Sequence, residues 1–168
     1  MVQVAENADR GTPYVEELRR VVEDAVPRLL SLSEADAKRR PRPGKWSPAE
    51  IIGHLIDSAS NNHQRFVRAQ FQDDLVFPGY DQDQWVASQA YRDAHWSDLV
   101  TLWKSFNIHI ARIMENFPAT IRNSPRARHN LDKLAWQPVP ADQPATLDYF
   151  MSDYVGHLKH HLAQIFPD

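Results

Sequence analysis

The sequence predicts an all-α fold, a four-helix bundle with long connections between some of its helices. Helix-forming residues such as Ala, Leu, Arg and Glu are plentiful, and only five of the 168 residues are glycine. This balance favours helices over turn-rich β structure. Four segments of about twenty residues also repeat apolar residues every three or four positions, as amphipathic helices do. Helices of this pattern bury their apolar faces by packing together in a bundle.

The first two helices are predicted from their start signals. The first is expected to run from Thr12, its N-cap, to Leu30, with a proline in its first turn. The second has the clearest start, because Ser47-Pro48-Ala49-Glu50 combines a capping box with a proline at the first helical position. It is expected to reach about Phe71. Between the two helices, residues 31–40 predict a short turn.

The last two helices are separated by a long connection. The third is expected to run from about Ser97 to Phe117, where a proline follows. The fourth begins after Thr146 as N-cap and ends before Pro167. Residues 118–145 are rich in proline and have few periodic apolar positions, so they predict a connection without long helices.

Shorter features are expected in the connections. Asp81 is suited to cap a short helix that reaches Trp85, and residues 131–136 predict a turn. No repeat or linker divides the chain, so residues 1–168 are predicted to form one domain, with residues 1–11 as a loose N-terminal tail.

Charge and composition exclude several functions. The net charge is −3, which gives no general attraction to nucleic acid or to an anionic membrane. The basic run from Lys38 to Pro43 is short and broken by proline, so we expect a solvated connector. The absence of cysteine leaves histidine to carry any transition-metal chemistry. Residues 1–11 lack the apolar region of a signal peptide, and no apolar run reaches membrane-spanning length, so we expect a cytoplasmic protein.

A histidine pair in the fourth helix is the first candidate for chemistry. His157 and His161 are four residues apart, so their side chains leave the same face of the helix and can reach one metal ion. Most such pairs in helices hold no metal, but this helix is otherwise apolar, and Gly156 within it indicates a close approach by another element. His160 points about 100° away from His161 and is assigned a lesser role.

His54 in the second helix is the candidate third ligand. It interrupts the apolar run 51–56, and a polar ridge follows it at helical spacing. The members of this ridge are Asp57, Ser58, Asn61 and Arg65. One interpretation is a buried, hydrogen-bonded histidine beside a partly exposed helix face. The other is a metal ligand followed by residues that line an open site, with Asp57 orienting an imidazole or a metal-bound water.

The motifs around these histidines resemble the DinB-like superfamily. The similar stretches are Trp46-Ser47-Pro48-Ala49-Glu50, His54-Leu55-Ile56-Asp57-Ser58 and Tyr154-x-x-His157-x-x-His160-His161. Pro78-Gly79-Tyr80-Asp81 followed by Trp85 is similar to its YfiT-type branch of metal-dependent hydrolases and bacillithiol transferases. The resemblance covers about residues 12 to 166. It implies a bundle of the DinB/YfiT type and three metal ligands, His54, His157 and His161. Arg128-His129-Asn130 departs from the family, in which a His-Pro and a glycine often stand there.

Three functions follow as hypotheses. Three neutral imidazoles leave a coordination position open, as in catalytic sites. Because of the resemblance, the first hypothesis is a stress-response S-transferase that conjugates a low-molecular-weight thiol to a small electrophile. Asp57 and Asn61 would assist at the metal, Arg65 would hold a carboxylate of the thiol, and Trp85 would line the pocket. The alternatives are a hydrolase using metal-bound hydroxide and a non-catalytic metal- or ligand-binding protein. Zn²⁺ is the expected ion and Ni²⁺ the alternative; the resemblance also implies a homodimer.

The remaining histidines are expected to lie away from the metal. His63 is about half a turn around the second helix from His54. His95 and His109 belong to the region of the third helix, and His129 lies in the long connection. The role of His129 stays open between a surface position and an approach to the pocket, and Trp136 is a further candidate for the pocket wall.

Overall fold

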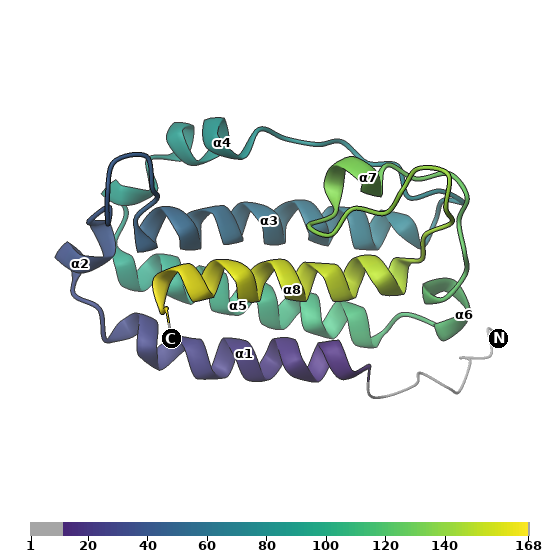
Figure 1. The fold of residues 1–168 in the computed structure, drawn as a ribbon. Helices are drawn as coiled ribbons and strands as arrows, with labels where there is room; N and C mark the ends of the chain where they lie inside the picture. The colour runs from purple at the N-terminus through teal and green to yellow at the C-terminus, as the bar shows by residue number, and fades with distance from the viewer. Residues whose placement is uncertain (1–11, 168) are drawn as a thin grey trace.

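Four long helices lie side by side in the computed structural model, which describes residues 12–167 (Figure 1). They are α1 (Pro13–Leu30), α3 (Pro48–Ala69), α5 (Trp96–Glu115) and α8 (Leu147–Ile165). Each contacts two others: α5 packs on α1 and α3, and α8 packs on the same two helices from the other side. The predicted four-helix bundle is therefore confirmed. The predicted tail, residues 1–11, lies outside the described residues.

Short helices occupy the connections. They are α2 (Glu34–Lys38), α4 (Gln82–Gln89), the 3-10 helix η1 (Tyr91–Asp93), α6 (Ala119–Arg122) and α7 (Leu131–Leu134). The helix expected to end at Trp85 extends one further turn, and α6 was not predicted. None of the helices in residues 12–167 combines the length and the hydropathy that a membrane span requires.

The predicted caps of α3 and α8 are present. Ser47 Oγ accepts a hydrogen bond from the Glu50 backbone N–H, and the Glu50 carboxylate accepts one from the Ser47 backbone N–H. Thr146 likewise accepts from the Tyr149 backbone N–H at 3.1 Å. Because these caps satisfy backbone N–H groups that would otherwise lack partners, they fix where the two histidine-bearing helices begin.

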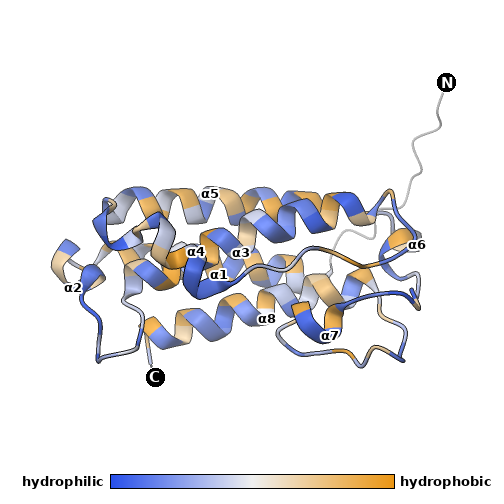
Figure 2. Cartoon of the chain, turned by 90° about the horizontal axis from the view of Figure 1, so that it is seen from above, coloured by the Kyte–Doolittle hydropathy of each residue, from blue (hydrophilic) through white to orange (hydrophobic). Residues whose placement is uncertain are grey.

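Each long helix buries one face. Figure 2 shows hydrophobic and hydrophilic residues alternating along these helices, as expected for elements with one face toward a common core. The largest fully buried side chains come from all four long helices, among them Leu18, Phe66, Trp103 and Met151. α3 is the most enclosed helix, since the short elements α2, α4 and η1 pack on it in addition to α5 and α8.

Two glycines let aromatic rings rest directly on helices. A Cβ on Gly53 of α3 would lie 2.1 Å from the Tyr91 ring, and one on Gly156 of α8 would lie 2.9 Å from the Trp136 ring. Only glycine allows so close an approach by a neighbouring group. The close approach predicted at Gly156 is thus found, and the group that approaches is Trp136.

The long connection between α5 and α8 is fastened to the segment after α3. Two backbone hydrogen bonds join these segments. The Leu75 N–H donates to the Arg128 carbonyl, and the Asn130 N–H donates to the Leu75 carbonyl. The Asn130 side chain also bonds both backbone groups of Phe77, at 3.1 and 2.9 Å. These bonds hold α7 beside the space between α3 and α8.

Candidate metal centre

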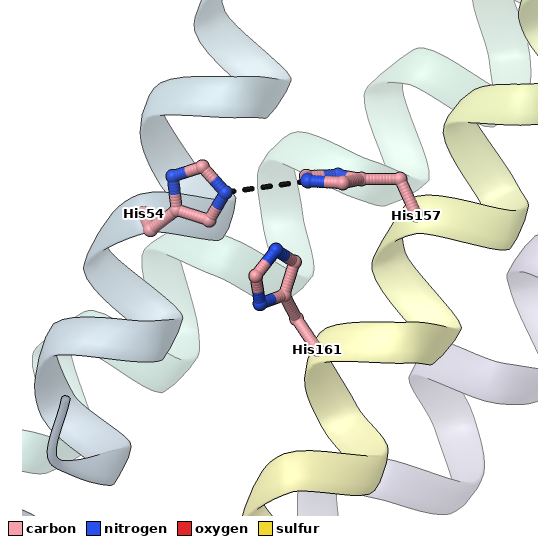
Figure 3. Close-up of side chains that lie close together, drawn as sticks. All are labelled: His54, His157 and His161. Atoms are coloured by element: carbon pink, nitrogen blue, oxygen red, sulfur yellow. Dashed lines mark hydrogen bonds between the residues drawn. The ribbon is translucent and has the colours of Figure 1, made fainter. Parts of the chain in front are cut away.

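Three histidines from two helices converge between α3 and α8. His54 comes from α3, and His157 and His161 come from successive turns of α8. The Nε2 atoms of His54 and His157 are 3.3 Å apart, and each of the three residues offers a ring nitrogen within 4.8 Å of the other two. Figure 3 shows one nitrogen of each ring turned toward the space between them.

The spacing of these nitrogens suits a divalent transition metal. Two imidazole nitrogens bound at tetrahedral positions of one Zn²⁺ lie about 3.4 Å apart, since each Zn–N bond is about 2.1 Å. The 3.3 Å between the Nε2 atoms of His54 and His157 matches this value. A three-imidazole donor set is also one that zinc and nickel accept.

Burial keeps these imidazoles neutral. Burial, together with the neighbouring imidazole of His161, lowers the pKa of both His54 and His157 to about 3. Burial also lowers the pKa of His161. A neutral imidazole has a free lone pair for a metal, so the three residues are ready to act as ligands at neutral pH.

Gln164 orients His161. Its Oε1 lies 3.2 Å from Nδ1 of His161, and its amide nitrogen lies 3.2 Å from Nε2 of His160. When Nδ1 of His161 donates to the amide oxygen, Nε2 is left free and faces the other two histidines. Outer hydrogen bonds of this kind fix the tautomer of metal-binding histidines. Sequence analysis missed Gln164, although its position three residues after His161 on the same helix would have indicated it.

His160 and His129 do not complete the cluster. His160 lies beside Trp136, with ring centroids 5.5 Å apart, and is not among the converging group. His129 is buried in the connection, where Nε2 lies 2.7 Å from the Gln143 carbonyl and Nδ1 accepts from the Leu131 backbone N–H. A closed, four-ligand site, which would have supported the non-catalytic hypothesis, is therefore not formed by the described residues.

A cavity of about 810 Å³ opens beside the three histidines. Its floor is one face of α3, formed by His54, Ser58, Asn62 and Arg65, all buried. The opposite wall is α8, with Tyr154 and His157, and the rim includes Tyr80 and Trp136. This volume is typical of sites that enclose a small molecule.

Two of the predicted substrate-binding residues lie outside the lining of this cavity. The Asn61 side chain donates to the Asp57 carbonyl of its own helix at 2.9 Å, and Asn62 lines the cavity instead. Since each residue advances about 100° around a helix, positions 54, 58, 62 and 65 share an arc of about 80°. Position 61 lies about 20° outside this arc, next to position 54. Trp85 packs outside, against Tyr80, with ring centroids 4.7 Å apart. Arg65, the third, does line the cavity.

Asp57 faces the α4–η1 connection and is not part of the cavity lining. Its Oδ1 accepts hydrogen bonds from the Tyr91 hydroxyl at 2.7 Å and the Gln89 amide at 2.8 Å. Burial raises the pKa of this carboxyl group, and the two hydrogen bonds oppose that shift. These hydrogen bonds hold the Tyr91 ring against Gly53, so Asp57 positions Tyr91 in this structure. Its predicted role at the metal stays a prediction.

His63 and His109 lie together on another face, as expected for residues away from the metal. Their ring centroids are 5.3 Å apart, and His63 also packs edge-on against Phe106.

Two comparisons with known proteins bear on the family and on the fold. The family model described as the DinB superfamily matches residues 17–165. A solved structure, that of YfiT from Bacillus subtilis, superposes with a TM-score of 0.75 at 16% identity, covering 98% of this chain and 89% of that one. It is described as a probable metal-dependent hydrolase with an unusual four-helix bundle topology. At this identity, the likeness shows the fold. No curated protein matches the sequence.

Proposed function

The chain belongs to the DinB superfamily, and from that premise we propose that it is a metal-dependent enzyme that transfers a low-molecular-weight thiol to a small electrophile. The observation that carries the proposal is the meeting of His54, His157 and His161 at the edge of a cavity large enough for a small molecule. Three protein ligands leave a position for substrate, which is typical of catalytic sites.

The three histidines would hold Zn²⁺, with Ni²⁺ as the alternative. When bound, such an ion supplies a Lewis acid that lowers the pKa of a coordinated thiol or water. The chain itself contributes neutral ligands, because burial keeps the pKa of His54 and His157 near 3. Gln164 holds the His161 ring in the tautomer that leaves Nε2 free.

In the proposed reaction, the sulfur of the thiol attacks the electrophilic carbon. A sulfur–carbon bond forms, the bond from carbon to the leaving group breaks, and the thiol proton passes to solvent. The protein has no cysteine, so the sulfur must come from a cosubstrate. The cavity of about 810 Å³ lies in the upper part of the range of about 300–1,000 Å³ that is typical of small-molecule pockets.

The three carboxylates that line the cavity are held in structural contacts or exposed to solvent. Both oxygens of Asp153 accept backbone N–H bonds, from Trp136 and Gln137 at 2.8 Å each, and Asp81 caps α4 by accepting from Gln84 N–H. The third lining carboxylate, Asp83, is exposed. A carboxylate held beside an attacking water as general base is therefore not found among these three, so either reaction would rely on a nucleophile ionised at the metal, a thiol or a water.

Thiol transfer is tested with zinc-loaded protein, purified without a histidine tag, and chlorodinitrobenzene as electrophile. We expect loss of free thiol and formation of the thioether with at least one of cysteine, glutathione, bacillithiol or mycothiol. Turnover should disappear when the metal is removed by a chelator and return when zinc is added back. No turnover above the metal-free control with any of these thiols would contradict the proposal.

Hydrolysis is the second candidate, because the similar structure of YfiT is described as that of a probable metal-dependent hydrolase. It predicts zinc-dependent cleavage of ester, amide or phosphate substrates without added thiol. Chromogenic esters, anilides and phosphates assayed with and without a thiol therefore separate the two reactions.

Gln164 provides a prediction about metal affinity. In the Gln164→Leu variant, His161 Nδ1 loses its acceptor, so we expect zinc affinity to fall about tenfold, the lower end for such outer contacts. Competition with a chromophoric chelator measures the change. Gln164→Glu, which keeps an acceptor for Nδ1, is the matched control and should retain most of the affinity. Equal affinity in Gln164→Leu and the wild type would show that this hydrogen bond does not orient His161.

A further inference from the structure

Arg65 is a buried cation without an acidic partner. Its exposed fraction is 6%, and the ion pairs among residues 12–167 do not include it. Its hydrogen bonds go to neutral groups, the Pro78 carbonyl at 2.9 Å and Asn62 Oδ1 at 3.4 Å. A buried guanidinium is normally paired with a carboxylate because removing its charge from water is costly. Arg65 therefore lacks the counter-charge that its burial calls for.

This cation lies at the cavity that begins at the three histidines. Arg65 and His54 both line it, on the same face of α3. Tyr80 lines it as well, and burial raises the pKa of its hydroxyl group to about 12 although the charge of Arg65 opposes the shift. The hydroxyl is thus protonated at neutral pH and can donate a hydrogen bond. Arg65 and Tyr80 together offer an anion both charge and donors.

The separation of His54 and Arg65 along α3 sets the length of a ligand that can contact both residues. His54 and Arg65 are eleven residues apart, which corresponds to about 16 Å along the helix axis. The Arg65 side chain leans back toward Asn62, to which it is bonded, as side chains on helices do, and this shortens the gap. A fully extended tripeptide spans about 10 Å, so a molecule must be at least about this long to reach from one group to the other.

Between the two ends the floor is polar. Ser58 and Asn62 are buried and lie on the cavity face of α3 between His54 and Arg65. The Asn62 amide nitrogen donates to the Ser58 carbonyl at 2.9 Å. A polar strip of this kind within a buried helix suits the polar backbone of a peptide-like molecule better than a hydrocarbon chain.

We propose that Arg65 binds the anionic end of an elongated substrate whose reacting group lies at the three histidines. This rests on the proposed function and narrows it: the thiol would carry a carboxylate or a phosphate at its far end. A guanidinium binds either group through two parallel hydrogen bonds. Small neutral thiols would be poor substrates, because they leave Arg65 without its counter-charge.

The test measures binding, without turnover, by isothermal titration calorimetry on the zinc-loaded protein. The carboxylate probe is N-acetyl-S-methylglutathione, compared with its neutral dimethyl ester. The phosphate probe is S-methyl-4′-phosphopantetheine, compared with S-methylpantetheine. For one pair, we expect the wild type to bind the anion at least about tenfold more tightly than the neutral counterpart, as a charge-assisted hydrogen bond implies. The pair that shows the preference identifies the anion.

Arg65→Gln should abolish this preference, and Arg65→Lys should keep part of it, since lysine retains the charge without the planar fork. Arg68→Gln, an exposed arginine one turn further along α3, is the matched control and should bind as the wild type does. Equal binding of both anions and their neutral counterparts by the wild type would overturn the proposal. So would an unchanged preference in Arg65→Gln, or in Arg65→Lys if Arg65→Gln does not fold.

The binding test distinguishes failure of the Arg65 proposal from failure of the proposed thiol-transfer reaction. The anion preference should persist in His157→Ala, because the S-methylated probes need no bond to a metal. A preference without thiol transfer in any assay would contradict the proposed reaction alone. Thiol transfer without a preference for anionic probes would contradict the role of Arg65 alone.

Discussion

Replacing His157 with alanine is expected to remove stoichiometric zinc from the protein. The wild type should retain about one ion per chain after dialysis, as a site with three protein ligands and an open position does. In the variant, only two of the three converging imidazoles remain, and we expect zinc affinity to fall by more than the ten- to hundredfold typical of outer-contact mutations (about 100-fold or more). Atomic emission or mass spectrometric metal analysis of untagged protein measures the loss.

His160→Ala is the matched control for this prediction. His160 is three residues from His157 on the same helix, but it lies outside the converging group and packs beside Trp136. Its removal should leave about one ion per chain, with a modest loss of affinity through Gln164. Equal zinc contents in His157→Ala and the wild type would refute the assignment of the metal centre. Loss of zinc in His160→Ala alone would show that His160 replaces one of the three.

Gly53→Ala is expected to cause the largest loss of stability among small substitutions in α3. The added Cβ would lie 2.1 Å from Cδ2 of Tyr91, and the ring cannot swing away freely because its hydroxyl donates to Asp57 at 2.7 Å. Overpacking of this kind lowers the free energy of unfolding by about 1–3 kcal/mol. This loss exceeds the gain of about 1 kcal/mol that alanine brings over glycine within a helix. Urea unfolding followed by circular dichroism measures the balance.

The clash itself is isolated by two further variants. In Gly79→Ala the added Cβ would meet Leu134 at 3.4 Å, an ordinary contact, so stability should change little. In a double-mutant cycle with Tyr91→Ala, the cost of Gly53→Ala should vanish, because the ring it strikes is gone. A Gly53→Ala variant as stable as the wild type, or a cost that persists without Tyr91, would show that the ring does not depend on this glycine.

The elements predicted best from the sequence are those with local signals. The capping box at Ser47 and the cap at Thr146 place the starts of α3 and α8 from a few adjacent residues, because capping depends on neighbours in the chain. The pair His157 and His161 follows from helical spacing alone. His54 required the family resemblance, since nothing local distinguishes a ligand from a buried, hydrogen-bonded histidine.

Which residues of a helix line the cavity depends on the side on which the neighbouring helix packs, and the sequence does not give that side. Helical spacing places Asn61 and Arg65 equally close to the direction of His54, about 20° to either side of it. Only the position of α8 makes Asn62 rather than Asn61 the cavity residue. Trp85 likewise lies outside the cavity lining and packs against Tyr80, which does line the cavity. Tertiary packing decides which of these residues line the cavity, and the periodicity of one segment carries no information about that packing.

The chain positions of the two facing histidines have a consequence for the molecule as a whole. His54 and His157 are 103 residues apart in the sequence, and an ion held by both would be a cross-link in a chain that has no cysteine with which to form one. A cross-link restricts the unfolded chain, and the entropy it removes grows with the length of the loop it closes. Because the folded chain assembles this site and the unfolded chain does not, the free energy of binding the ion adds to the free energy of unfolding. The same three side chains would thus join the second of the four long helices to the fourth.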